Sequence, residues 1–284
     1  MKKQQLILLG SGGLLFCLIF FFGTTLPPKT KASPTNATAA ASPSGQITFS
    51  TILNASKSQL SPAQQGYVSQ LETAVVRGDV KTQQIKVYRQ LAAFWRDSAH
   101  LLLPYSHYMG EAAKLENSEK SLTFAAHFLL DGLRRQNDLA VKKWMATEAQ
   151  ELFEKALKIN ALNDSSKIGL GACFLFGQIS ENPMMGIQMI REVADRDPRN
   201  MYAQFILGLG GLESGQFDKA IERLSKVVTR QPDNIEATVG LAEAYERKGD
   251  KIQAIQWYEA SKKFFANDTE ILQEIDARIN LLKK

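Results

Sequence analysis

A repeat of 34 residues is the feature that most constrains what this sequence can fold into. Residues Met201–Asn234 align without a gap on Ile235–Asp268. Similar residues recur where a helical hairpin has to be narrow, to turn or to bury a face. The recurring pairs are Ala203 and Ala237, Leu207 and Leu241, Gly215 and Gly249, Ala220 and Ala254, and Ile221 and Ile255. A fixed period of roughly 20–50 residues is typical of proteins built from stacked repeats.

Each unit of the repeat predicts two packed helices. In the first unit, Tyr202–Ser214 places small and apolar residues on one helical face, and Gly215 then ends the helix. Asp218–Arg230 is predicted to form the second helix. Ala220 lies where the two helices cross, so a larger side chain there would push them apart. Pro232 ends the hairpin.

A third copy precedes these two. Residues Asp164–Asn200 carry the same pattern with three more residues, which we place in the turn around Gln178–Pro183. The order of Leu-Gly or Leu-Ala, an aromatic residue, Gly, Ala and Pro resembles the tetratricopeptide repeat (TPR). The tryptophan usual in the first helix of that family is replaced by Lys167, Gln204 and Thr238. The resemblance implies an all-α right-handed solenoid of antiparallel helix pairs, with repeats at residues 164–200, 201–234 and 235–268.

The segments on either side of these repeats also have helical patterns. Residues 49–163 space their apolar residues as helices do, with a break at Leu101–Pro104, so we expect degenerate TPR-like hairpins there. Residues 269–284 are expected to form a capping helix, which a solenoid needs at its end. No stretch alternates with a period of two over the length of a strand.

The amino end carries an apolar stretch. Residues 6–26 contain no charged side chain, and a helix of this length spans about 30 Å, the hydrocarbon thickness of a bilayer. Lys2 and Lys3 precede it, which favours a short cytoplasmic tail at residues 1–5 and a folded part outside the cytoplasm. We therefore expect an uncleaved transmembrane signal-anchor helix, with a cleaved signal peptide as the alternative.

The composition of the region after this stretch predicts a linker. Residues 27–48 are rich in Pro, Ala, Ser and Thr without apolar periodicity, so we expect a disordered linker.

Cys17 and Cys173 are the two cysteines and lie in unlike segments, so no disulfide framework is expected. The short basic start and the lack of such a framework favour a bacterial-type inner membrane, crossed once, with the folded part in the periplasm.

No motif in the sequence indicates catalysis. The net charge is +5 and no run of basic residues exceeds two, so we expect no nucleic-acid partner. His107 and Glu111 are spaced to share one helical face, but no third ligand stands nearby in sequence, so no metal site is predicted. There is no nucleophile motif, phosphate-binding loop or paired-carboxylate signature, and we expect neither enzymatic activity nor a cofactor.

The resemblance to TPR proteins also implies where a ligand binds. First helices line the concave side of such a stack, and fixed positions on them contact the ligand. The positions we expect to contact a protein or peptide partner are Ile168, Leu175, Phe176, Tyr202, Phe205, Leu209, Leu212, Glu236, Glu243, Glu246 and Arg247. They do not carry the combination of Lys, Asn and Arg found in TPRs that bind chaperone tails, and suit an apolar or amphipathic helix with some basic character. The alternative is that other helices of the chain cover Phe205, Leu209 and Leu212.

These features predict a membrane-anchored TPR scaffold or adaptor that binds a protein or peptide partner through the concave face of its repeats. Two alternatives stay open at this point. In one, the repeats pack on another copy of the chain and form a structural homo-oligomer. In the other, the protein is an accessory subunit of a cell-envelope enzyme complex.

Overall fold

The computed structural model of this chain describes residues 47–77, 80–180 and 182–284. The chain divides into two units, Met1–Pro43 and Ser44–Lys284, and every described residue belongs to the second. The predicted tail, the predicted signal-anchor helix and all but the last two residues of the predicted linker lie outside the described residues. Among the helices of the described part, none has both the length and the hydropathy that crossing a bilayer requires.

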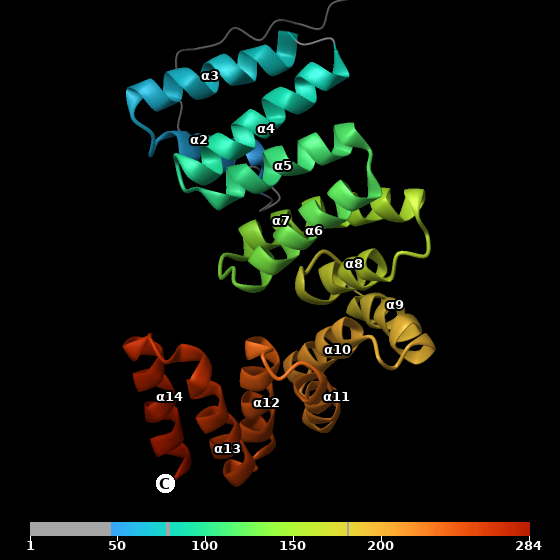
Figure 1. Ribbon diagram of the computed structural model, residues 1–284, viewed down its shortest axis with the longest axis vertical. Helices are drawn as coiled ribbons and strands as arrows, with labels where there is room; N and C mark the ends of the chain where they lie inside the picture. The colour runs from blue at the N-terminus through green and yellow to red at the C-terminus, as the bar shows by residue number, and fades with distance from the viewer. Residues whose placement is uncertain (1–46, 78–79, 181) are drawn as a thin grey trace, which may run out of the picture. The chain divides into compact units, whose positions relative to one another are not determined.

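All regular structure in the described residues is helical, which confirms the all-α prediction for that part of the chain (Figure 1). The helices, in order, are α2 (Phe49–Lys57), α3 (Pro62–Arg77), α4 (Lys81–Asp97), α5 (Leu102–Glu116), α6 (Glu119–Arg134), α7 (Leu139–Ile159), α8 (Asp164–Phe176), α9 (Pro183–Arg196), α10 (Met201–Glu213), α11 (Phe217–Arg230), α12 (Ile235–Lys248), α13 (Lys251–Ser261), the 3₁₀-helix η1 (Lys262–Phe265) and α14 (Thr269–Leu282).

Consecutive helices of the repeat region pack side by side as hairpins. Only residues 214–216 join α10 to α11, so α11 runs back along α10, and α8 with α9 and α12 with α13 form the same kind of pair (Figure 1). Each hairpin also packs on the next, since α9 contacts α10 and α11 contacts α12. Residues 177–182 link α8 to α9, and this link is three residues longer than the one at 214–216. The extra residues of the third copy therefore lie in the turn where the sequence placed them.

A side-chain cap starts the first helix of each repeat. Asn163, Asn200 and Asn234 precede α8, α10 and α12. The side-chain oxygen of each accepts a hydrogen bond from the backbone amide three residues on, at 2.9, 3.0 and 2.9 Å. Asp268 caps α14 in the same way at 3.1 Å. Such a cap satisfies an amide that has no partner inside the helix, and so it fixes where the helix begins.

Glycines end the first helices of the last two repeats, as predicted. Gly215 follows the end of α10 with φ of 75°, and Gly249 ends α12 with φ of 91°. This left-handed conformation is costly for residues with a Cβ atom and is readily adopted by glycine. The chain can therefore turn sharply into the second helix.

The break before α5 differs from the one expected at Leu101–Pro104. Helix α4 ends at Asp97, the chain turns with His100 at φ of 56°, and α5 begins at Leu102. Pro104 lies in the first turn of α5. Its missing N–H costs no hydrogen bond there, because amides of a first turn have no partner within the helix.

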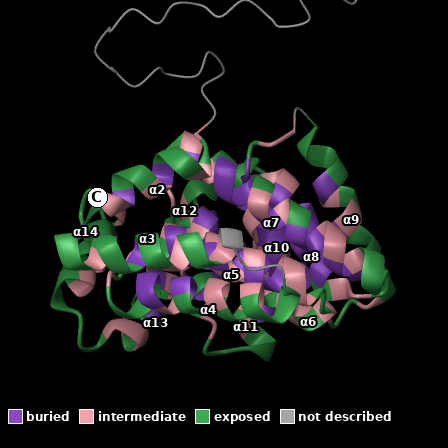
Figure 2. Ribbon diagram, turned by 90° about the horizontal axis from the view of Figure 1, so that it is seen from above, coloured by how far each residue is buried: buried purple, intermediate pink, exposed green. Residues whose placement is uncertain are grey.

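The main core runs through the hairpins from α6 to α12. Leu129, Phe153, Ile168 and Leu224 have no exposed surface and belong to one cluster. Figure 2 shows all buried residues in purple. A second cluster around Trp95 holds α3, α4 and α5 together. The repeat hairpins thus bury their apolar faces in a core that they share with α6 and α7.

Candidate functional site

Four of the predicted contact residues are buried inside the chain. Ile168 is 0% exposed, Phe176 3%, Phe205 7% and Leu212 6%. They pack in the hairpin cores and are not available to a partner in this structure, which corrects the expectation that they line an open groove. The guanidinium of Arg134, from α6, lies 5.4 Å from the centre of the Phe205 ring. A helix of the degenerate hairpins therefore covers part of the face on which we expected a ligand.

The other apolar positions of the predicted face are half-buried. Tyr202 lies edge-on to His127 of α6, with the tyrosine hydroxyl 3.4 Å from the imidazole Nδ1. Leu175 and Leu209 pack against the main core while keeping part of their surface exposed. These three residues leave only small apolar patches on that face.

The charged positions of the predicted face contact other parts of the chain. Glu236 lies 2.9 Å from the guanidinium of Arg134. Glu246 accepts hydrogen bonds from the Tyr258 hydroxyl at 2.8 Å and from Arg278 Nε at 2.9 Å, so it ties α12 to α13 and α14.

Glu243 and Arg247 lie on one face of α12, 3.4 Å apart. Arg247 also donates a hydrogen bond to the Leu212 carbonyl oxygen at 3.1 Å. Of the predicted acidic residues, Glu243 is the one engaged only within its own helix. Burial raises the pKa of the neighbouring Glu213 carboxyl, and the charge of Glu243 adds to this effect.

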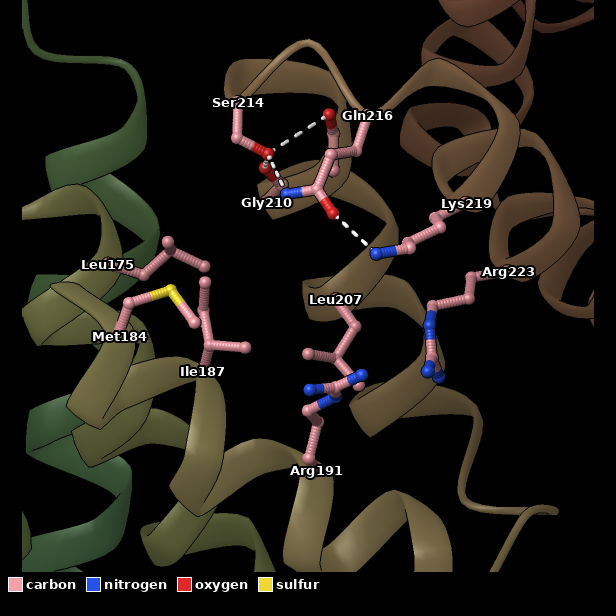
Figure 3. A pocket seen from close by; sticks show the side chains of 11 residues that line it. Leu175, Met184, Ile187, Arg191, Leu207, Gly210, Ser214, Gln216, Lys219 and Arg223 are labelled. Carbon is pink, nitrogen blue, oxygen red and sulfur yellow. Dashed lines mark hydrogen bonds between the residues drawn. The ribbon is translucent and has the colours of Figure 1, made fainter.

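A recess lies elsewhere on the stack, where α9 faces α11 across α10 (Figure 3). It encloses about 120 Å³. A bound water needs roughly 10–15 Å³ in this measure, so the recess has room for a side chain. Its lining residues are Leu175, Met184, Ile187, Arg191, Leu207, Gly210, Gly211, Ser214, Gln216, Lys219 and Arg223. We call it the α9–α11 pocket.

Glycines of α10 shape this pocket. A Cβ added at Gly210 would lie 2.7 Å from Cδ2 of Leu175, and one at Gly211 would lie 3.2 Å from the backbone nitrogen of Ala220. Because these positions carry no side chain, α11 and Leu175 approach the α10 backbone closely. The pocket floor is therefore formed by α10 backbone and Leu207.

The two sides of the pocket differ in chemistry. Figure 3 shows Met184 and Ile187 with Leu175 on one side, and Lys219 and Arg223 on the other. The polar side is held by hydrogen bonds to neutral acceptors. The Lys219 ammonium donates to Gln216 Oε1 at 2.7 Å, and Arg223 Nη1 donates to Gln204 Oε1 at 2.8 Å.

A second cluster lies between α5 and α7. His107 and Glu111 of α5 meet Glu148 of α7, and one ligand atom from each lies within 4.8 Å of the others. Sequence spacing did not reveal Glu148, because it belongs to another hairpin. The Lys114 ammonium lies among these groups, 2.9 Å from Glu111, 3.8 Å from Glu148 and 2.7 Å from Glu151. An ammonium among three carboxylates already supplies the charge that a metal ion would bring, so we assign this cluster to holding α5 against α7.

The α9–α11 pocket has the chemistry of a binding site. No carboxylate, imidazole or thiol is among its lining residues, and its charged groups are the cations Arg191, Lys219 and Arg223. Cys173 lies in the core, and burial raises the pKa of its thiol, which keeps it from acting as a thiolate nucleophile. What the pocket provides is an apolar wall opposite positive charge.

The sequence of the C-terminal region matches a known family. Residues 211–278 fit the model of the tetratricopeptide repeat. This part of the chain therefore resembles tetratricopeptide repeats. The matched TPR segment starts at the end of α10 and reaches into α14, so it includes α11 and the whole α12–α13 hairpin. A comparison with curated proteins finds no match.

Solved structures with similar folds include MamA from Desulfovibrio magneticus RS-1, at 22% identity over 67% of this chain and 98% of that chain, with a TM-score of 0.44. Another MamA structure matches 66% of this chain and 94% of its own at 17% identity, with a TM-score of 0.42. YrrB, described as a TPR protein with an unusual peptide-binding site, matches 70% and 98% at 17% identity, with a TM-score of 0.40.

Proposed function

We propose that this protein is a non-catalytic adaptor that binds another protein or a peptide through its TPR hairpins. The observation that carries the proposal is the α9–α11 pocket. It is a recess of side-chain size on hairpins that bury their apolar faces in a shared core. A rigid stack with a preformed recess can bind a segment of another protein without first having to order itself.

Site-specific photo-crosslinking in cells tests this adaptor function. A photoreactive amino acid at Met184, on the pocket wall, is expected to capture one defined partner. The matched control position is Leu162, which is 84% exposed and lies between α7 and α8, away from the pocket. Capture of the same protein from both positions, or of none from Met184, contradicts binding through the pocket. Capture of only a second copy supports the self-associating alternative.

We also propose that residues 6–26 anchor the protein in a bacterial-type inner membrane, with the TPR part in the periplasm. The support is the uncharged apolar stretch and the lysines that precede it. In this arrangement the adaptor binds its partner close to the membrane surface.

Topology is measured with reporters fused after Lys284. Alkaline phosphatase, which folds only in an oxidising compartment, is expected to be active, and the fusion is expected to sediment with membranes. An active phosphatase fusion that is released from membranes supports the cleaved signal peptide. A reporter active only in the reducing compartment contradicts the proposed orientation.

A further inference from the structure

One face of α11 is basic along its length. Lys219, Arg223, Lys226 and Arg230 follow one another at intervals of three or four residues, so they share one side of the helix. The first two line the α9–α11 pocket, together with Arg191 from α9. The charge was not evident as a run in the sequence, because acidic and apolar residues separate these positions.

Three carboxylates near the pocket are engaged by other cations. Asp218 lies 2.7 Å from Lys248, and Glu222 lies 2.6 Å from Lys226. Glu192 pairs with Lys167.

Within the described residues, Arg191, Lys219 and Arg223 form no ion pair with a carboxylate. Three cations without a carboxylate partner in the described residues therefore lie together at the pocket.

The wall opposite Lys219 and Arg223 is apolar and accessible. Met184 is 51% exposed, and Ile187 lies one turn further along α9 on the same side of the pocket (Figure 3). An apolar group of a ligand that enters between this wall and Leu207 is removed from water. Negatively charged groups beside it on the ligand then lie near the guanidinium and ammonium groups of the pocket. The recess thus matches a ligand that combines an apolar side chain with nearby negative charge.

We propose that the α9–α11 pocket binds an acidic peptide segment of another protein. An apolar side chain of the segment enters between Met184 and Leu207, and carboxylates beside it contact Arg191, Lys219 and Arg223. This inference rests on the proposed adaptor function and names the chemistry of the partner. It differs from the partner expected from the sequence, which was an apolar or amphipathic helix with some basic character on the concave face.

The apolar wall favours a peptide over other anionic ligands. A nucleic-acid backbone or an anionic membrane surface is held by distributed charge and makes no use of a recess lined by Met184, Ile187 and Leu175. The neighbouring recess beside Arg199 and Arg230 has fewer cations without a carboxylate partner, because its Lys226 is paired with Glu222. The α9–α11 pocket is therefore the place where apolar contact and unbalanced charge coincide.

The test is a fluorescence-anisotropy titration of the purified full chain in detergent. The probe is a short labelled peptide in which leucines stand among glutamates. The comparison probes are the same peptide with lysine for glutamate, a single-stranded RNA, and vesicles containing phosphatidylglycerol. We expect saturable binding of the acidic peptide that weakens as salt is raised.

Variants locate the binding. Arg191→Glu and Lys219→Glu are each expected to weaken binding of the acidic peptide about tenfold or more, and Met184→Ser to weaken it without changing the salt dependence. Lys251→Glu is the matched control, because it makes the same charge change at an exposed position on α13 and should leave binding unchanged. Circular dichroism confirms that each variant is folded.

Three outcomes overturn this inference. One is no binding of the acidic peptide, another is equal binding by wild type and Lys219→Glu, and the third is stronger binding of RNA or vesicles than of peptide. If crosslinking from Met184 still captures a partner in those cases, the adaptor function stands and only the acidic chemistry is wrong. If neither experiment detects binding, both proposals fail.

Discussion

Small residues at helix crossings set how closely the repeats pack. At Gly171 in α8, an added Cβ would lie 2.7 Å from the Gly186 carbonyl oxygen and 2.7 Å from Ile190 Cγ1. A Cβ at Gly240 in α12 would meet only leucine methyl groups, at 3.4 and 3.5 Å, which is ordinary contact. Both glycines lie inside helices, so the two positions separate the effect of packing from that of helix propensity.

Gly171→Ala is expected to destabilise the protein by about 1–3 kcal/mol, because backbone of α9 has to move away from α8. Gly240→Ala is expected to be neutral or to stabilise by about 0.5–1 kcal/mol, since alanine favours the helix. Urea unfolding measures both. Equal losses of unfolding free energy for the two variants would contradict the claim that α8 and α9 cross too closely to accept a Cβ atom at Gly171.

His127 is predicted to make stability depend on pH. The imidazole lies between α6 and α8, with Nε2 2.8 Å from the Ser165 hydroxyl, and burial lowers its pKa although the charge of Asp131 opposes this. In the unfolded chain a histidine titrates near about 6.5. Below that pH the unfolded state takes up a proton that the folded state accepts only at lower pH. Stability should therefore fall as the pH drops from about 6.5 through the folded pKa.

His127→Gln keeps a hydrogen-bonding side chain and removes this titration. We expect the urea midpoint of the variant to change less than that of wild type between neutral and mildly acidic pH. The measurement is a set of unfolding curves across that interval. Parallel pH profiles for the two proteins would show that His127 is not the group responsible.

Among the elements, the last two hairpins were the most predictable from sequence. The repeat predicted α10 to α13, and Gly215 and Gly249 end helices as expected, because a left-handed turn residue has a local signature. The caps at Asn163, Asn200 and Asn234 recur at matching places in the repeats, so they too have a local signature in the sequence.

The degenerate hairpins were less predictable. Pro104 was expected to belong to a break between helices, but it lies within the first turn of α5, where proline is tolerated. The pairing of α5 with α7 through Lys114 depends on residues that are distant in sequence and follow no repeat.

Lys114 is predicted to hold α5 and α7 together. Lys114→Met leaves Glu111, Glu148 and Glu151 facing one another. Because these groups are partly exposed, we expect a loss of about 1–3 kcal/mol at neutral pH, between the values for exposed and buried pairs. Lys226→Met is the control. It breaks the surface pair with Glu222 and should cost less than about 1 kcal/mol.

The loss from Lys114→Met should shrink in acid. Burial raises the pKa of Glu148, but His107 and Lys114 outweigh it and hold this pKa below its ordinary value. The stability that this carboxylate contributes is present above the unfolded pKa of about 4.3 and is lost as the pH falls through the folded pKa. Urea unfolding at neutral and acidic pH should therefore show the gap between wild type and variant closing. A gap that stays constant would assign the loss to packing of the lysine stem.

For the whole molecule, the fold class followed from the sequence more completely than the site did. The period of 34 residues fixes hairpins and their neighbours, but it does not say which faces stay open once every helix is in place. Arg134, from a helix without the full repeat signature, covers Phe205. Arg191 and Lys219 line one pocket although they belong to different hairpins. Such juxtapositions arise from packing between units, so a position-by-position reading of one repeat misses them.

The central claim is that the TPR hairpins bind a partner at the α9–α11 pocket. It is tested most directly by recovering the crosslinked partner from cells that express wild type, the Arg191→Glu/Lys219→Glu variant or the Lys251→Glu control, each with the photoreactive residue at Met184. At equal expression, the account predicts full recovery with wild type and the control and a loss of about tenfold or more with the double variant. Undiminished recovery with the double variant would contradict it.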